Sequence, residues 1–251
     1  MRVVLLGSGT SVPSALRSPP GLLVECADRR QLVDPGPGAC HRLAVAGCSP
    51  PDIDDVVISH LHPDHISDLV PFLFTLRNPC WGSEISWPRL IGPRGLLAFY
   101  RQLQLPFGRW LPSPDGEIEL LEWGGDPIRA GKFSLKGHPV EHLGSSLAWR
   151  WTEEGGAAFV FSGDTGLCDG IVEAAADADL LLLECSAPLG AAHDGHLCPD
   201  GASEVIRRSG ARRVVLVHLN PECDQVDLVD QFDEDILGRV ETGRDLETYE
   251  T

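Results

Sequence analysis

The sequence predicts an α/β fold in which β-sheets pack together and helices cover them on the outside. Short apolar runs bounded by Gly, Pro or Asp alternate along the chain with segments of helical spacing. The 251 residues are 43% hydrophobic, enough to bury a sizeable core without a disulfide. No obvious linker or internal repeat divides the chain, so we expect one domain over residues 1–251.

The first half of the chain alternates strands and helices. Strands are predicted at residues 3–6, 22–24, 31–33, 56–58 and 90–91. Helical spacing predicts helices at residues 39–46, 66–76 and 96–103, the last opened by Gly92-Pro93. We expect a loop over the Pro- and Gly-rich residues 81–93.

The second half begins with strand-like runs over residues 118–151. Further strands are predicted at residues 158–161, 180–183 and 214–217, and a helix at residues 202–208. Residues 221–251 contain eleven Asp and Glu against two Arg, a local charge of −9 within a total of −17. We expect this tail to form a solvated terminal helix with an acidic face.

The composition indicates which cellular compartment and which class of binding partner we expect. No apolar stretch reaches 18 residues, and the N-terminal apolar run stops at Gly7, too early for a signal peptide. We therefore expect a cytoplasmic protein without a membrane span, whose eight scattered cysteines are reduced and mostly buried. The charge of −17 works against binding phosphate backbones, which disfavours nucleic acid and favours a small-molecule substrate.

Polar side chains recur where predicted strands end. His60, Asp164, Glu184 and His218 each follow an apolar strand. One such histidine is more often structural than functional, but four strand ends of this kind predict a site at one edge of the sheets.

The segment ISHLHPDHISD places His60, His62, Asp64 and His65 within six positions. Neutral imidazoles bind borderline divalent metals, and carboxylates add the charge that a dication needs. Two histidines two residues apart can point the same way on an extended backbone, and Pro63 then turns the chain so that Asp64 and His65 face a second point. A polar surface loop is the alternative interpretation. We favour the metal site, because each imidazole would need its own hydrogen-bond partner if it were buried.

These residues resemble the HxHxDH metal motif of the metallo-β-lactamase superfamily. The segments LVDPGPG, HPVEH, SGDTG and VLVHLNP resemble its other motifs in the expected order. The resemblance implies a four-layer αββα sandwich of two mixed β-sheets flanked by helices. It also implies two divalent metal ions. The histidine-rich set favours zinc, although manganese or iron would accept it. The first ion would bind His60, His62 and His142, the second Asp64, His65 and His218, and Asp164 would bridge them.

The branch that the chain resembles is that of the ribonuclease Z-like phosphodiesterases. The segments LLGSGTSVPS, LIGPRGL and GHLCPDG carry this likeness. It implies a hydroxide activated by the metals as nucleophile, oriented by Asp64 or Asp164. Glu184 would orient His196, which would help to protonate the leaving oxygen. A homodimer is compatible with this branch. The remaining histidines, His41, His138 and His193, match no motif position, and we expect them at the surface or packed in the core.

Two departures bear on the substrate. Members that process tRNA carry a long Gly- and Pro-rich arm between the third His and the bridging Asp, whereas only residues 143–163 separate His142 from Asp164 here. The cysteine-rich insert of a branch that acts on cyclic phosphates is absent from residues 8–17. We expect a small phosphodiester as substrate. A lactonase or thioesterase, a tRNA 3′-processing endonuclease (disfavoured by the missing arm and the charge) and a non-catalytic scaffold are the alternatives.

Aromatic and basic residues gather between His65 and His142. The aromatic side chains could line an apolar pocket, although ordinary packing is the better-supported interpretation. Three arginines of this region are candidates for binding a phosphate. The residues are Trp81, Trp87, Phe99, Tyr100, Phe107, Trp110, Arg77, Arg94 and Arg101.

Overall fold

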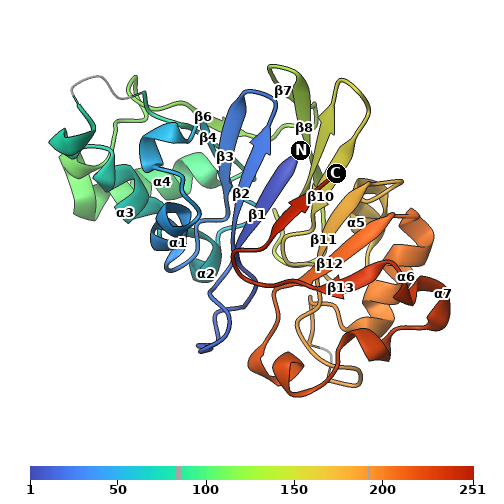
Figure 1. Cartoon of the computed structure of the whole chain (residues 1–251). Helices are drawn as coiled ribbons and strands as arrows, with labels where there is room; N and C mark the ends of the chain where they lie inside the picture. The colour runs from blue at the N-terminus through green and yellow to red at the C-terminus, as the bar shows by residue number, and fades with distance from the viewer. Residues whose placement is uncertain (83–85, 192) are drawn as a thin grey trace.

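The computed structural model describes residues 1–82, 86–191 and 193–251. Two seven-stranded β-sheets lie face to face, and helices cover both outer faces (Figure 1). This is the four-layer αββα sandwich of mixed sheets that the family resemblance implies. Within the described ranges, no helix combines the length and the apolar character needed to cross a membrane. Residues 83–85 of the loop predicted over residues 81–93 lie outside those ranges.

The first sheet contains strands from both ends of the chain. They are β1 (Arg2–Gly7), β2 (Gly21–Cys26), β3 (Arg29–Val33), β4 (Asp55–Val57), β5 (Arg89–Gly92), β6 (Leu120–Glu122) and β14 (Thr248–Glu250). The order is β14-β1-β2-β3-β4-β5-β6, antiparallel from β14 to β3 and parallel from β3 to β6.

The second sheet is built from the second half of the chain. Its strands are β7 (Ile128–Ala130), β8 (Phe133–Pro139), β9 (Leu147–Glu153), β10 (Ala158–Phe161), β11 (Leu180–Glu184), β12 (Arg213–Val217) and β13 (Val240–Thr242). The order is β13-β12-β11-β10-β9-β8-β7, parallel from β13 to β10 and antiparallel from β10 to β7.

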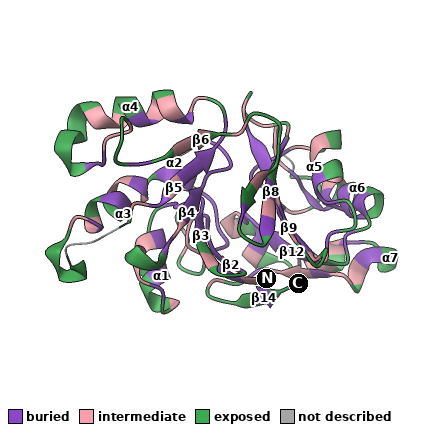
Figure 2. Cartoon of the chain, turned by 90° about the horizontal axis from the view of Figure 1, so that it is seen from above, coloured by how far each residue is buried: buried purple, intermediate pink, exposed green. Residues whose placement is uncertain are grey.

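The helices form the two outer layers (Figure 2). On the first sheet lie α1 (Ala39–Val45), α3 (Leu69–Thr75) and α4 (Leu96–Phe107), and α2 (Pro63–Ile66) follows β4. On the second sheet lie α5 (Asp169–Ala174), α6 (Pro199–Ser209) and α7 (Glu234–Leu237). Short 3₁₀ helices occur at Pro50–Asp52, Pro79–Trp81, Gly108–Trp110, Pro221–Gln225 and Val229–Gln231.

Alternation along the strands creates the three apolar layers. In β1, Val3 and Leu5 face the other sheet and pack in one cluster with Trp149. Val4 and Leu6 point the opposite way, into the cluster that the first group of helices covers. Because successive side chains of a strand point to opposite faces, a fully buried strand has to be apolar at every position.

The prediction of a solvated terminal helix over residues 221–251 is wrong. After α7, the segment forms two strands, and each joins a sheet. In β13, Val240 pairs with Val214 in a parallel ladder, and in β14, Tyr249 pairs with Val3 in an antiparallel one. Tyr249 has no exposed surface. The alternation Thr248-Tyr249-Glu250 places the aromatic ring in the core and both polar neighbours outside, so the acidic composition concealed a strand.

Candidate metal centre

Four of the candidate residues stand where strands of the two sheets end. His60 follows β4, Asp164 follows β10, His218 follows β12, and Glu184 is the last residue of β11. Because β10, β11 and β12 are parallel neighbours, their carboxyl ends meet at one edge of the second sheet. The Nε1–H of Trp149 in the second sheet donates to the carbonyl of Ile58 at 3.0 Å, which ties the end of β4 to that sheet.

The turn predicted at Pro63 is present. His62 has an extended backbone, with φ −68° and ψ 147°, and Pro63 occupies the first position of the four-residue helix α2. Proline suits this position because its fixed φ matches the helix and its missing N–H leaves no donor unpaired. The helical turn then carries Asp64 and His65 away from the direction of His62.

One group of ligand atoms is formed by His60, His62, His142 and Asp164, whose atoms all lie within 4.8 Å of one another. The Nε2 atom of His142 lies 3.1 Å from Nδ1 of His62. Nε2 of His60 lies 3.5 Å from an oxygen of Asp164. Residues 80 positions apart in sequence thus converge on one point.

A second group, formed by Asp64, His65 and His218, also lies next to Asp164. Nε2 of His218 lies 3.7 Å from Oδ2 of Asp64 and 3.4 Å from Oδ2 of Asp164. Nε2 of His65 lies 3.2 Å from Oδ1 of Asp164. Asp164 therefore contacts both groups, and the structure brings all seven predicted ligands together.

Several polar atoms of this centre lack a hydrogen-bond partner among the described residues. They are Nε2 of His60, His65 and His218 and Oδ1 of Asp164, all buried. Close approach to Asp164 does not satisfy these nitrogens, because the groups are not aligned as hydrogen bonds. Buried polar atoms without partners are destabilising, and divalent cations would satisfy them. The donor set of imidazoles and carboxylates therefore fits the metal ions that the fold implies.

The protonation states of two candidate ligands also suit a cation. Burial lowers the pKa of the His60 imidazole to about 2, so the ring is neutral, as a metal ligand must be. Burial would raise the pKa of Asp64, but the contact with His218 and the charges of His65 and His218 outweigh it and lower the value to about 2. Asp64 is therefore ionised at neutral pH.

Asp34 supports the centre from behind, although no role was predicted for it. Its carboxylate accepts the backbone N–H of Ser59 at 2.7 Å and bonds Nδ1 of His65 at 2.7 Å. The Ser59 hydroxyl bonds both Asp34 and Nδ1 of His60. Engaging Nδ1 leaves Nε2 of each ring to face the centre. The signal in the sequence was an Asp directly after a strand, within the LVDPGPG segment.

His196 lies beside both groups and is held by Glu184. Nδ1 of His196 is 2.9 Å from Oε1 of Glu184, which has no exposed surface. The ring centroid of His196 is 4.8 Å from that of His142 and 5.5 Å from that of His218. The two residues that the sequence predicted for proton transfer therefore flank the centre.

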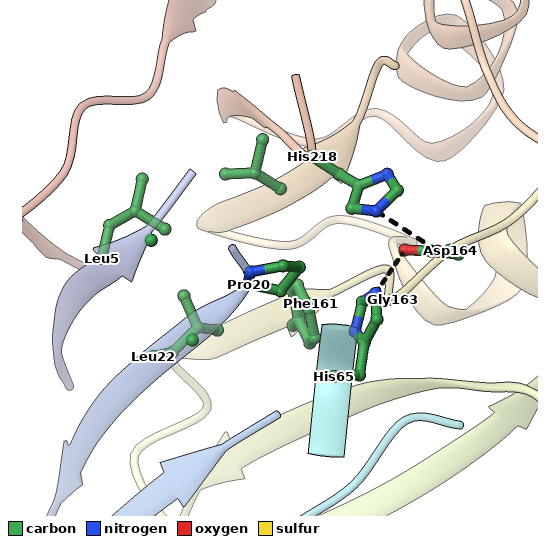
Figure 3. A pocket seen from close by; sticks show the side chains of 11 residues that line it. Leu5, Pro20, Leu22, His65, Phe161, Gly163, Asp164 and His218 are labelled. Carbon is green, nitrogen blue, oxygen red and sulfur yellow. Dashed lines mark ion pairs between the residues drawn. The ribbon is translucent and has the colours of Figure 1, made fainter. Parts of the chain in front are cut away.

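Beneath the centre the two sheets close around a small void of about 10 Å³. Figure 3 shows Leu5, Leu22 and Phe161 on its apolar side, with Asp164 between His65 and His218. This apolar floor keeps bulk water away from the buried side of the ligands.

The remaining histidines and aromatic residues lie apart from this constellation. His41 and His193 are exposed, and His138 is buried in β8, as expected for surface and packing residues. Tyr100 belongs to α4 and is buried in the core that this helix covers. Phe107 and Trp110 line an apolar groove of about 320 Å³ that none of the candidate metal ligands lines.

Residues 29–219 match the family described as the Beta-lactamase superfamily domain. The chain belongs to the β-lactamase superfamily. The resemblance drawn from the HxHxDH motif is confirmed, and this superfamily member is a metal-dependent hydrolase.

Two relatives align with most of this superfamily member. The uncharacterized protein Rv1339 of Mycobacterium tuberculosis is 29% identical over 254 residues, which cover 100% of this chain and 92% of the relative. A ribonuclease Z of Mycolicibacterium gilvum is 28% identical over 249 residues, which cover 88% of this chain and 85% of the relative.

Three solved structures share the superfamily fold. The metallo-β-lactamase fold protein YhfI of Bacillus subtilis superimposes with a TM-score of 0.79 at 22% identity, covering 99% of this chain and 98% of that one. The short form of human tRNase Z gives a TM-score of 0.78 at 22% identity, with coverages of 100% and 99%. A diphosphatase of the PhnP family gives 0.74 at 18% identity, with coverages of 99% and 97%. At these identities the likeness concerns the fold.

Proposed function

We propose that this hydrolase is a dinuclear metal-dependent phosphodiesterase that acts on a small phosphodiester. The observation that carries the proposal is the bond between His196 and Glu184 next to two ligand groups that share Asp164. A relative named ribonuclease Z and structures named tRNase Z and diphosphatase also support chemistry at a phosphorus–oxygen bond.

The seven converging side chains would hold two divalent cations, for which zinc is our first proposal. His60, His62 and His142 would hold one, Asp64, His65 and His218 the other, and Asp164 both. When bound, such cations neutralise charge on phosphoryl oxygens and lower the pKa of a water that contacts them.

His196 would donate the proton that the leaving alkoxide needs. Its Nδ1 is engaged by Glu184, which leaves Nε2 available to the substrate. The hydrogen bond to Glu184 raises the pKa of His196, which favours the protonated imidazole that a proton donor needs. Proton donation of this kind contributes about 10²–10⁴-fold to a rate. Asp64, which is ionised, would orient the attacking water.

The segment between His142 and Asp164 supports a small substrate rather than a tRNA precursor. Strands β9 and β10 use residues 147–153 and 158–161 of the interval, so only turns remain. A substrate-binding arm would have to extend from this interval, and the chain has a net charge of −17. Both features favour a small-molecule substrate.

The proposal is tested with purified protein, its metal content and three substrates. We expect about two equivalents of divalent metal and turnover of bis(p-nitrophenyl) phosphate well above that of p-nitrophenyl acetate and an acyl-homoserine lactone. The variant His60→Ala should lose turnover, whereas His41→Ala, which changes an exposed histidine, should keep it. A protein that cleaves only the ester or the lactone is a carboxylic ester hydrolase, and the proposal is then wrong.

A further inference from the structure

A pocket of about 250 Å³ lies at the same end of the sandwich as the candidate metal centre. Three segments line it. Arg94 comes from the loop after β5, Trp123 to Gly125 follow β6, and the connection from β8 to β9 contributes Pro139 and Gly144 to Leu147.

Backbone hydrogen bonds connect this pocket to the candidate centre. Strands β4, β5 and β6 are parallel neighbours, so their carboxyl ends stand side by side, with about 5 Å between adjacent strands. The N–H of Leu147, in the pocket wall, donates to the carbonyl of Ser59 at 3.1 Å, and Ser59 directly precedes His60. The pocket is therefore a side chamber of the edge that carries the ligands.

Arg94 gives this chamber a positive charge that no ion pair with a described carboxylate neutralises. Its side chain is exposed and forms no ion pair with a described carboxylate, in a chain of 37 acidic and 20 basic residues. Arg101, on α4, has Asp115 at 3.3 Å. Glu122, the nearest acid in sequence to Trp123, instead accepts the N–H groups of Gly95 and Leu97 at the start of α4.

The other lining groups add hydrogen-bond donors. The indole nitrogen of Trp123 is buried and has no partner among the described residues. Gly124 and Gly125 are exposed and have no side chain to cover their backbone. The guanidinium of Arg94 and the open backbone of the two glycines suit an anion, because both offer donors at the surface of the chamber, whereas the indole nitrogen is covered.

The chamber and His196 flank the His142 loop. Nδ1 of His142 bonds the carbonyl of Gly195 at 3.0 Å, which places the loop of His196 against the imidazole. The residues after His142 line the chamber instead. A phosphodiester whose leaving group faces His196 would then extend its other half toward Arg94.

We infer that this chamber binds an anionic substituent, a phosphate or a carboxylate, on the half of the substrate that does not leave, and that Arg94 selects for it. The inference rests on the proposed phosphodiesterase function and names a substrate class for it. An arginine paired with such a group gives about a tenfold preference, which corresponds to about 1.4 kcal/mol.

The test uses thymidine 3′-(p-nitrophenyl phosphate) in three forms: with a free 5′-hydroxyl, with a 5′-phosphate and with a 5′-succinyl ester. All release p-nitrophenolate, so differences report on the half that does not leave. For the wild type we expect kcat/KM about tenfold higher with either anion, mainly through KM, and the larger effect shows which anion is preferred. Arg94→Ala should abolish the preference and Arg94→Lys should keep part of it.

Two controls separate the possible failures. Arg101→Ala should keep the preference, and the Arg94 variants should keep the metal content of the wild type. Equal kcat/KM for the three compounds in the wild type, or a preference that survives Arg94→Ala, overturns the assignment of the chamber alone. If the wild type hydrolyses none of them or bis(p-nitrophenyl) phosphate, the phosphodiesterase function fails and the inference fails with it.

Discussion

Nδ1 of His196 lies 2.9 Å from Oε1 of Glu184, a carboxylate with no exposed surface. Glu184 also accepts the backbone N–H of Thr165 at 2.6 Å and that of Leu197 at 3.1 Å. Thr165 is next to Asp164, and Leu197 is next to His196, so one buried carboxylate joins the loop of the shared ligand to the loop of the proton donor. Three donors fix this carboxylate, which in turn orients the imidazole.

The substitution His196→Ala should leave the metal in place and lower kcat on a phosphodiester with an alkoxide leaving group by about 10²–10⁴-fold. The loss should be much smaller for a p-nitrophenyl ester, because p-nitrophenolate leaves without a proton. Turnover of the two esters by the wild type and the variant measures the ratio. Equal losses on both would show that His196 is no proton donor.

Metal analysis of the same variant addresses a competing role. Asp164, His196 and His218 offer ligand atoms within 4.8 Å of one another, so His196 is also placed to bind a cation. We expect His196→Ala to retain the metal content of the wild type. A variant that lost one equivalent would make His196 a ligand rather than the proton donor.

Asp34→Asn should weaken metal binding without unfolding the chain. The carboxylate of Asp34 forms hydrogen bonds with both Ser59 and His65, and the asparagine amide cannot replace both. The His65 ring therefore loses its fixed orientation. Loss of such an outer partner lowers metal affinity by about 10–100-fold. Competition with a chelator measures the affinity, and Asp28→Asn, at an exposed turn, is the matched control. Unchanged affinity in Asp34→Asn would remove its supporting role.

A buried ion-pair network at Asp55 should make the free energy of unfolding depend on pH in the acidic range. Asp55 is fully buried, with Nε of Arg89 at 2.6 Å and Nη2 of Arg29 at 2.8 Å. Burial would raise the pKa of Asp55, but the bonds from Arg89, Arg29 and Gln31 outweigh it and lower the value. Since the folded pKa lies below the unfolded one, this stabilisation is present above about pH 4 and is lost as pH falls through the folded pKa.

Asp55→Asn should therefore lower the free energy of unfolding by about 3 kcal/mol at pH 7, and the difference from the wild type should narrow below about pH 4. Urea unfolding with a chelator present measures the loss at pH 7 and its change with pH, without a contribution from bound metal. Asp115→Asn, which changes an exposed pair with Arg101, should stay within about 0.5 kcal/mol. A difference independent of pH would contradict the ionic origin.

Tyr249→Ala should show that the acidic tail is part of the sandwich. The ring is fully buried in β14, so its removal leaves a cavity between the sheets and costs about 3–5 kcal/mol. Thermal or urea unfolding measures the loss, and the exposed Glu250→Ala is the control. An effect near zero would place the tail outside the core.

Local sequence patterns predicted most of the strands because fully buried strands have to be apolar. The runs at residues 3–6, 22–24, 180–183 and 214–217 each fall inside an observed strand. The prediction for residues 221–251 was wrong because β13 and β14 are edge strands rich in polar residues. Only pairing with β12 and β1 makes them strands. The helix predicted over residues 66–76 is interrupted: α2 ends at Ile66, and α3 begins at Leu69 with Asp68 as its N-cap.

The candidate site was visible in the sequence where its residues stand next to strands or in the HxHxDH motif. His142 and His196 lie in loops without such a signal, and only the family resemblance pointed to them. Asp34 follows a strand within the LVDPGPG segment, but its contact with the ring of His65 is made by the fold and could not be read from its position along the chain. The chamber at Arg94 combines three segments that only the fold brings together.

The most direct test is a crystal structure of the zinc-loaded protein with anomalous scattering measured at the zinc edge. We predict two anomalous peaks, one among His60, His62 and His142 and the other among Asp64, His65 and His218, with Asp164 between them. A single peak, or peaks away from these side chains, would contradict the dinuclear centre.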